Sequence, residues 1–157
     1  MRIGYVMIFA IVFLFILSVR SSPSGAASDP DACALLTQAQ VSAALGHSIG
    51  AGQHAGPVVR MCQWTSAQAF VQLDIMGQMG SLSPTDRFNN AKSPVGGITK
   101  TPIGGVGDDA YYITNVSGTS LNVRKGNSAF EIRVRGVPAD QIKAVEKSLA
   151  QEAVLKL

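Results

Sequence analysis

The stretch Leu121–Arg135, LNVRKGNSAFEIRVR, decides most of the fold that the sequence predicts. Gly126-Asn127 is typical of a two-residue hairpin turn of the primed type, and it separates two runs in which apolar and polar residues alternate. A hairpin turning there places Val123 opposite Phe130, with the apolar side chains of both strands on one side. On the opposite, solvent-facing side we expect Asn122, Arg124, Glu131, Arg133 and Arg135.

The segments on either side of this hairpin are predicted from the same rules. Ala110–Thr114 is a third strand, and Pro138 begins a last helix with Asp140 in its first turn. The apolar stripe of that helix consists of Ile142, Val145, Leu149 and Ala153. Off the stripe lie Lys143, Glu146, Lys147 and Glu152, which we therefore expect to be solvated.

An earlier pair of runs, residues 60–65 and 70–76, predicts a second hairpin that turns at Ala67-Gln68. This register sets Trp64 opposite Val71 and Cys62 opposite Leu73. Both apolar faces then lie on the same side of the sheet, which a wrong pairing would not produce.

Two short helices are predicted from their caps. Thr37 with Gln40 forms a capping box for a helix over Thr37–Leu45, which Gly46 ends. Ser83 followed by Pro84 and Asp86 marks the start of another helix that ends near Ala91.

The predicted order of elements is α-β-β-α-β-β-β-α, an α+β domain. We expect an antiparallel sheet of about five strands with helices packed on its apolar face. The order is compatible with two degenerate halves, each a hairpin followed by a helix. The glycine-rich segments His47–Pro57 and Ser93–Asp109 are predicted as loops, the second as a loop or an irregular edge.

The first residues differ from the rest of the chain. Arg2 precedes an uncharged apolar run from Val6 to Val19, and small residues at Gly25 and Ala27 fit a cleavage site. We therefore expect residues 1–27 to be a signal peptide and residues 28–157 a single exported domain, periplasmic or secreted. The alternative is an uncleaved membrane anchor over residues 3–19, at the short limit for a bilayer span.

Composition excludes several classes of protein. The 157 residues carry a net charge of +3, and removing Arg2 and Arg20 with the leader leaves 13 − 2 = 11 basic against 10 acidic residues. Such a balance excludes a strongly basic nucleic-acid-binding protein. One apolar run excludes a polytopic membrane protein, and the length excludes a multidomain enzyme.

The two cysteines, Cys33 and Cys62, both lie in the predicted exported part. An even count in an oxidising compartment predicts a disulfide between them. The alternatives are two buried thiols or, less in keeping with the spacing, a metal site, since 28 residues separate the cysteines.

No motif in the chain identifies a catalytic centre or a cofactor site. Gly105–Ala110 matches a dinucleotide fingerprint in letters only, because no strand-then-helix context surrounds it. Asp108 and Asp109 are adjacent in an extended segment and point to opposite faces, so we expect a turn or capping role. His47 and His54 lack ligand partners at metal-site spacing, and we predict neither a metal nor a cofactor.

Basic residues gather on the outer face of the last hairpin, and an anionic surface is their natural partner. They are Arg124, Lys125, Arg133 and Arg135, and the competing interpretation is an ordinary solvated sheet face. Asn115-Val-Ser117 is also a glycosylation sequon, relevant only in a host that glycosylates exported proteins.

Four motifs together resemble a family of bacterial secreted proteins and lipoproteins of unknown function. They are residues 31–41 (DACALLTQAQV), residues 62–64 (CQW), residues 105–110 (GVGDDA) and residues 123–127 (VRKGN). The resemblance covers about residues 29–153 and implies an exported α+β domain with a disulfide between the two matched cysteines. It implies no activity and no catalytic residues, and this chain lacks the lipidation cysteine of the lipoprotein members.

These observations favour a non-enzymatic exported binding or envelope-associated domain that uses its glycine-rich loops, with an envelope protein or a small ligand as partner. A small secreted hydrolase and a protein inhibitor are the alternatives. The hydrolase would require a pocket that joins His47 or His54 to Asp108 or Asp109 and a serine. The candidate binding surface comprises His47, His54, Asp108, Asp109, Arg124, Arg133 and Arg135.

Overall fold

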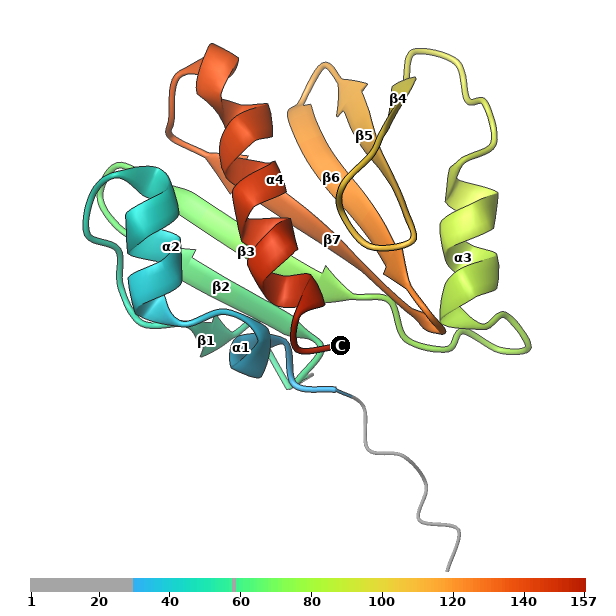
Figure 1. The fold of residues 1–157 in the computed structure, drawn as a ribbon, viewed down its shortest axis with the longest axis horizontal. Helices are drawn as coiled ribbons and strands as arrows, with labels where there is room; N and C mark the ends of the chain where they lie inside the picture. The colour runs from blue at the N-terminus through green and yellow to red at the C-terminus, as the bar shows by residue number, and fades with distance from the viewer. Residues whose placement is uncertain (1–29, 58) are drawn as a thin grey trace, which may run out of the picture.

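The computed structural model describes residues 30–57 and 59–157 as an α+β domain built on one sheet (Figure 1). The predicted leader and its cleavage site lie outside the described residues. The helices are α1 (Ala32–Leu35), α2 (Gln38–Leu45), α3 (Pro84–Ala91) and α4 (Ala139–Val154). The strands are β1 (Gln53–His54), β2 (Met61–Thr65), β3 (Phe70–Ile75), β4 (Thr99–Ile103), β5 (Asp109–Asn115), β6 (Gly118–Lys125) and β7 (Ser128–Arg135).

The sheet has seven strands in the order β1-β2-β3-β7-β6-β5-β4, and every neighbouring pair is antiparallel. The expectation of about five strands was too low, because β1 lies inside a segment predicted as a loop and β4 inside one predicted as a loop or an irregular edge. β1 pairs with β2 over only two residues, and β4 pairs its mostly exposed residues with β5. Neither β1 nor β4 has an alternation of apolar and polar residues, so each can be recognised as a strand only from its backbone pairing with its neighbour.

Both predicted hairpins are confirmed in register. Trp64 lies opposite Val71 in the β2–β3 pair, and Val123 lies opposite Phe130 in the β6–β7 pair. Gly126 takes a φ of 55° at the β6–β7 turn, a conformation that costs glycine little. β3 then pairs with β7, which joins the two hairpins into one sheet.

The predicted helix caps are also confirmed. Thr37 and Gln40 form a capping box at the start of α2, and Gly46 ends that helix with a φ of 74°. Ser83 and Asp86 form a second capping box at the start of α3, with Pro84 in the first turn. Local hydrogen bonding therefore sets these helix boundaries.

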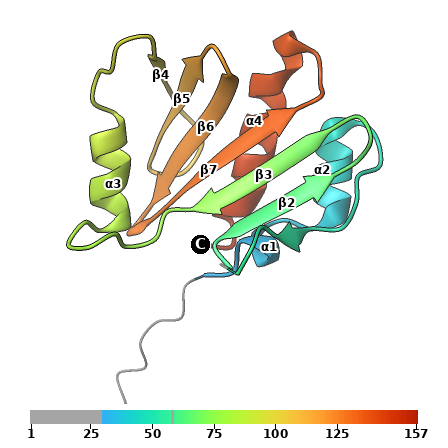
Figure 2. The same cartoon turned by 180° about the vertical axis from the view of Figure 1, so that it is seen from behind.

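Helices cover both faces of the sheet, not one as expected (Figures 1 and 2). α1, α2 and α4 pack with the main core, which includes Trp64, Phe130 and Leu149. α3 lies on the other face, where Phe88 packs against Tyr111 and Ala129 in a separate cluster. Because the helices that follow the two hairpins lie on opposite faces, the arrangement does not support a repeat of hairpin-helix halves.

Two residues predicted to be solvated are buried. Asn122 is 1% exposed, on the sheet face that α3 covers in part. Glu146 is 0% exposed on α4, where its carboxyl group faces the sheet and not the solvent.

Within the described ranges, no helix is both long and apolar enough to cross a membrane.

Cys33 and Cys62 form the predicted disulfide, which ties α1 to β2 with a Cα–Cα distance of 5.0 Å. The bond lies beside the fully buried indole of Trp64. Gly52 passes close to both, since a Cβ atom there would lie 2.7 Å from Trp64 Nε1 and 2.9 Å from Cys62 Sγ. The disulfide thus belongs to the core and fixes the N-terminal helix on the sheet.

Cys33→Ala should lower the free energy of unfolding by about 2–5 kcal/mol, because the open chain regains the entropy of a closed loop. Chemical denaturation of the purified domain measures this loss. A reducing agent should destabilise the wild-type protein by a similar amount and leave the variant almost unchanged. Equal stability of the wild-type protein in reducing and oxidising buffer would contradict the prediction.

Candidate anion-binding pocket

The sheet splits between β6 and β7 on the side away from their turn (Figures 1 and 2). Paired residues run from the turn to Leu121 opposite Ile132. Beyond that pair, Gly118–Ser120 at the start of β6 stays paired with β5, and Arg133–Arg135 at the end of β7 stays paired with β3. The two ends therefore separate without leaving their other neighbours.

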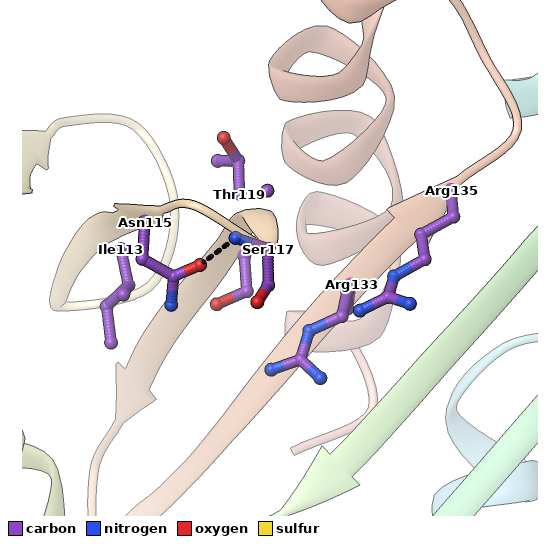
Figure 3. Close-up of a pocket in the computed structure, with 8 residues that line it drawn as sticks. Ile113, Asn115, Ser117, Thr119, Arg133 and Arg135 are labelled. Atoms are coloured by element: carbon purple, nitrogen blue, oxygen red, sulfur yellow. Dashed lines mark hydrogen bonds between the residues drawn. The ribbon is translucent and has the colours of Figure 1, made fainter. Parts of the chain in front are cut away.

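A pocket of about 230 Å³ opens at this split, on the outer face of the sheet (Figure 3). β7 contributes two arginines, and the β5–β6 hairpin contributes small, mostly polar residues. The lining consists of Ile113, Asn115, Ser117, Gly118, Thr119, Ser120, Arg133 and Arg135. The volume lies below the range of about 300–1,000 Å³ that is usual for drug-sized ligands, so the pocket suits a small group.

The two arginines differ in how far their charge is already compensated. Arg133 Nη2 donates to Glu131 Oε1 over 2.6 Å, and both side chains are half-buried. Arg135 is exposed, and within the described residues its guanidinium group has no hydrogen bond or ion pair. Alternate residues of a strand point to the same face, so both guanidinium groups project to the pocket side, as Figure 3 shows.

The opposite wall presents hydroxyl and amide groups. Ser120 is 5% exposed, and within the described chain its hydroxyl has no hydrogen-bond partner. Asn115 Oδ1 accepts the backbone N–H of Ser117 over 2.8 Å, which holds the β5–β6 turn in shape (Figure 3). The predicted glycosylation sequon is therefore part of the pocket rim.

This arrangement has the chemistry of an anion site. Guanidinium groups donate in a planar fork that matches a carboxylate or a phosphate, and hydroxyl groups can complete the shell of donors. Since Arg135 and Ser120 have no partner within the described chain, both are free to donate to a bound oxygen.

A row of polar residues borders the pocket on the same face. Asp74 of β3 pairs in register with Glu131, the partner of Arg133. Burial raises the pKa of Asp74, and the nearby negative charge of Glu131 raises it further. The charges of Arg87, Arg60 and Arg133 oppose this rise, so Arg133 interacts with both carboxyl groups of the row.

Asp31 and His54 form a separate pair beside the disulfide. His54 Nε2 lies 2.7 Å from Asp31 Oδ1, and this contact lowers the pKa of Asp31. Cys33 is near both groups, but its sulfur is bonded to Cys62 and offers no thiolate to a metal. One carboxylate and one imidazole are too few for the usual zinc site. Asp31 also caps α1, so the pair has a structural role.

The two adjacent aspartates of the VGDDA motif have separate structural roles. Asp108 accepts the backbone N–H of Gly126 over 2.7 Å and pairs with Lys125 at 3.2 Å, and these contacts lower its pKa. Asp109 pairs with Lys92 of α3 at 2.6 Å. The first therefore holds the β6–β7 turn, in line with the expected turn role, whereas the second forms an ion pair beside α3.

The remaining predicted residues lie away from the pocket. Arg124 pairs with Asp108 at the turn end of the hairpin, opposite Ala129. Arg133 is four residues further along β7 than Ala129, so roughly 13 Å of strand separates it from Arg124. His47 follows α2, and its Nε2 is buried without a partner in the described chain. Neither this pocket nor the one between Gly105–Gly107 and the end of α4 has a histidine in its lining, so neither joins a histidine to Asp108 or Asp109 as the hydrolase alternative requires.

The glycine-rich segment forms a second, more apolar pocket of about 320 Å³ against the end of α4. Gly105–Gly107 line one side of this pocket. The other side is lined by Gln151, Glu152, Val154 and Leu155. Gln151 Nε2 donates to Gly105 O over 3.1 Å and fastens the loop to the helix. The predicted loop surface is thus partly occupied by the domain's own C-terminal helix.

Sequence reasoning identified the arginines of the pocket but missed its other wall. A signal was available for Ser120, because extending the predicted hairpin register by one residue sets it across from Arg133. No local signal predicts that the two strands separate at this point and leave a pocket instead of a continuous ladder.

The fold and the pocket define an α+β domain with one disulfide and a cationic pocket on the outer face of its sheet. Comparisons with protein-family models, with curated proteins and with solved structures return no match for this chain. The relation to the secreted family suggested by the sequence motifs therefore stays a prediction.

Proposed function

We propose that this protein is an exported, non-enzymatic binding domain whose pocket between β6 and β7 holds the anionic group of a small ligand or of an envelope component. The observation that carries the proposal is the guanidinium of Arg135, which lines one pocket with Arg133 and the hydroxyl of Ser120, while neither Arg135 nor that hydroxyl has a side-chain partner among the described residues. A phosphate or a carboxylate is the chemistry that such donors recognise.

Two further observations support this proposal. The Cys33–Cys62 disulfide is compatible with an oxidising compartment outside the cytoplasm. The lining residues that β5, β6 and β7 place around the pocket include several potential hydrogen-bond donors and no acid, and Glu131, which contacts Arg133, is already paired with it. A binding role needs only these features and no nucleophile.

Arg135→Gln should weaken the binding of a small anion about 10-fold or more, because a hydrogen bond to a charged group is worth about 1.5–3 kcal/mol. The probes are sulfate and acetate, titrated at constant ionic strength into the ¹⁵N-labelled domain. Amide signals of residues 117–120 and 133–135 should shift in the wild-type protein.

Arg124→Gln is the matched control, since it removes the same charge from the same hairpin outside the pocket. It should leave the affinity within about two-fold of the wild type, because surface charges at this range are screened. Equal weakening by both substitutions would show that only net charge matters. The absence of any shift with either anion would overturn the anion-binding function.

A further inference from the structure

Glu146 is the one fully buried acidic side chain among the described residues, and it lies behind the pocket. It projects from α4, which packs against β6 and β7. Its Oε1 accepts the backbone N–H of Val134 over 3.2 Å, while Oε2 has no partner in the described chain. A buried carboxylate with one free oxygen is costly, so its presence requires an explanation.

The split in the sheet explains where this carboxyl group sits. Val134 lies between Arg133 and Arg135 on β7, past the last residue of that strand that pairs with β6. Its N–H bonds to Glu146. The carboxyl group therefore contacts the same three-residue segment whose arginines line the pocket, from the opposite face of the sheet.

Charged and titratable groups surround Glu146 from three elements. Lys143 lies on α4 itself, Glu131 and Arg133 on β7, and Tyr112 on β5. Burial is the largest influence and raises the pKa of Glu146 to about 8, while the hydrogen bond from Val134 opposes this rise. Arg133 therefore interacts electrostatically with Glu146 on one side and lines the pocket on the other.

We propose that the pocket binds its anion together with a proton on Glu146, so that Glu146 acts as a proton-linked regulator of the same site. This inference rests on the proposed anion-binding function. An ionised Glu146 would act as an internal anion behind Arg133 and would repel a bound anion through the thin layer of β7. When Glu146 is neutral, it no longer offsets the attraction between the two arginines and the bound anion.

Thermodynamic linkage makes this coupling reciprocal. If deprotonation of Glu146 weakens binding of the anion, then the bound anion must strengthen binding of the proton by the same factor. The pocket should hold its ligand at neutral pH and release it in alkaline solution. Anion binding near pH 8 should also take up protons from the buffer.

The first test compares wild type and Glu146→Gln with sulfate as the probe, because sulfate keeps its charge over the whole range. Between pH 6.5 and pH 9.5 we expect the wild-type affinity to fall about five-fold or more, the lower end of usual coupling factors. Glu146→Gln should keep the same affinity at both pH values, since its amide oxygen can still accept the N–H of Val134. An equal fall in both proteins would overturn the proposal.

A second measurement needs no variant. Calorimetric titration of wild type with sulfate at pH 8, in two buffers of different ionisation enthalpy, reports the protons taken up per anion bound. We expect net uptake, and zero uptake would overturn the linkage. If sulfate binds at pH 6.5 and its affinity does not depend on pH, only the proposed role of Glu146 is rejected. If neither sulfate nor acetate binds at pH 6.5, the anion-binding function itself is rejected.

Discussion

Phe130→Ala should lower the free energy of unfolding by about 3–5 kcal/mol, the usual cost of removing a buried aromatic ring. Phe130 is 0% exposed on β7, near the centre of the sheet. It pairs in register with Val123 on one side and with Ile75 on the other. Its loss leaves a cavity in the main core, and the strands of the sheet are held by their own ladders and cannot collapse to fill it.

Chemical denaturation followed by tryptophan fluorescence measures this change, because Trp64 is buried in the same core. Phe70→Ala is the matched control, since Phe70 is only half-buried on the outer face of β3. We expect the control to cost about 1 kcal/mol. A near-neutral Phe130→Ala would contradict the β6–β7 register on which the whole fold rests.

The stability of the wild-type protein should fall as the pH rises from about 4.5 to about 8, through the raised pKa of Glu146. In this window the unfolded chain has an ionised Glu146, whereas the folded chain keeps the proton. The native state therefore binds more protons, and stability decreases by up to about 1.4 kcal/mol per pH unit. The total loss is roughly 3–5 kcal/mol, with full stability present below the unfolded pKa.

Glu146→Gln should remove this slope, because the amide does not ionise. Asp74, whose pKa is also raised, adds a smaller slope of the same sign and remains in both proteins. Denaturation curves at half-unit pH intervals from 4.5 to 9 separate the two contributions. A wild-type curve that stays parallel to that of the variant across the window would show that Glu146 ionises freely in the folded protein.

Local sequence rules predicted the parts of the fold that depend on neighbours in the chain. The Gly126-Asn127 turn and the alternating strands around it specified the β6–β7 register, because a shift by one residue would expose the apolar face. The Thr37 and Ser83 capping boxes specified two helix starts through hydrogen bonds three residues apart. These features are satisfied within one short segment and need no tertiary contact.

Glu146 shows where such reasoning fails. Its charge led to the prediction that it is solvated, although it lies four residues after Ile142 and three before Leu149, which places it on the apolar face of the helix. Its burial depends instead on the N–H of Val134, which lies beyond the end of the β6–β7 ladder. Only the divergence of two strands creates that unpaired donor, so the helical pattern could predict the direction of the Glu146 side chain but not its partner.

The sequence by itself determined the α+β class, both central hairpins and the helices that Thr37 and Ser83 cap, because turns, caps and apolar alternation act locally. The pairing of the two cysteines was predicted instead from their even count and the predicted export. The tertiary structure alone decided the strand β1, the pairing of β4, the placement of α3 on the outer face and the split between β6 and β7. Each of these depends on backbone groups far apart in the chain. The pocket arises from that split, which brings Arg133 and Arg135 to face Ser120.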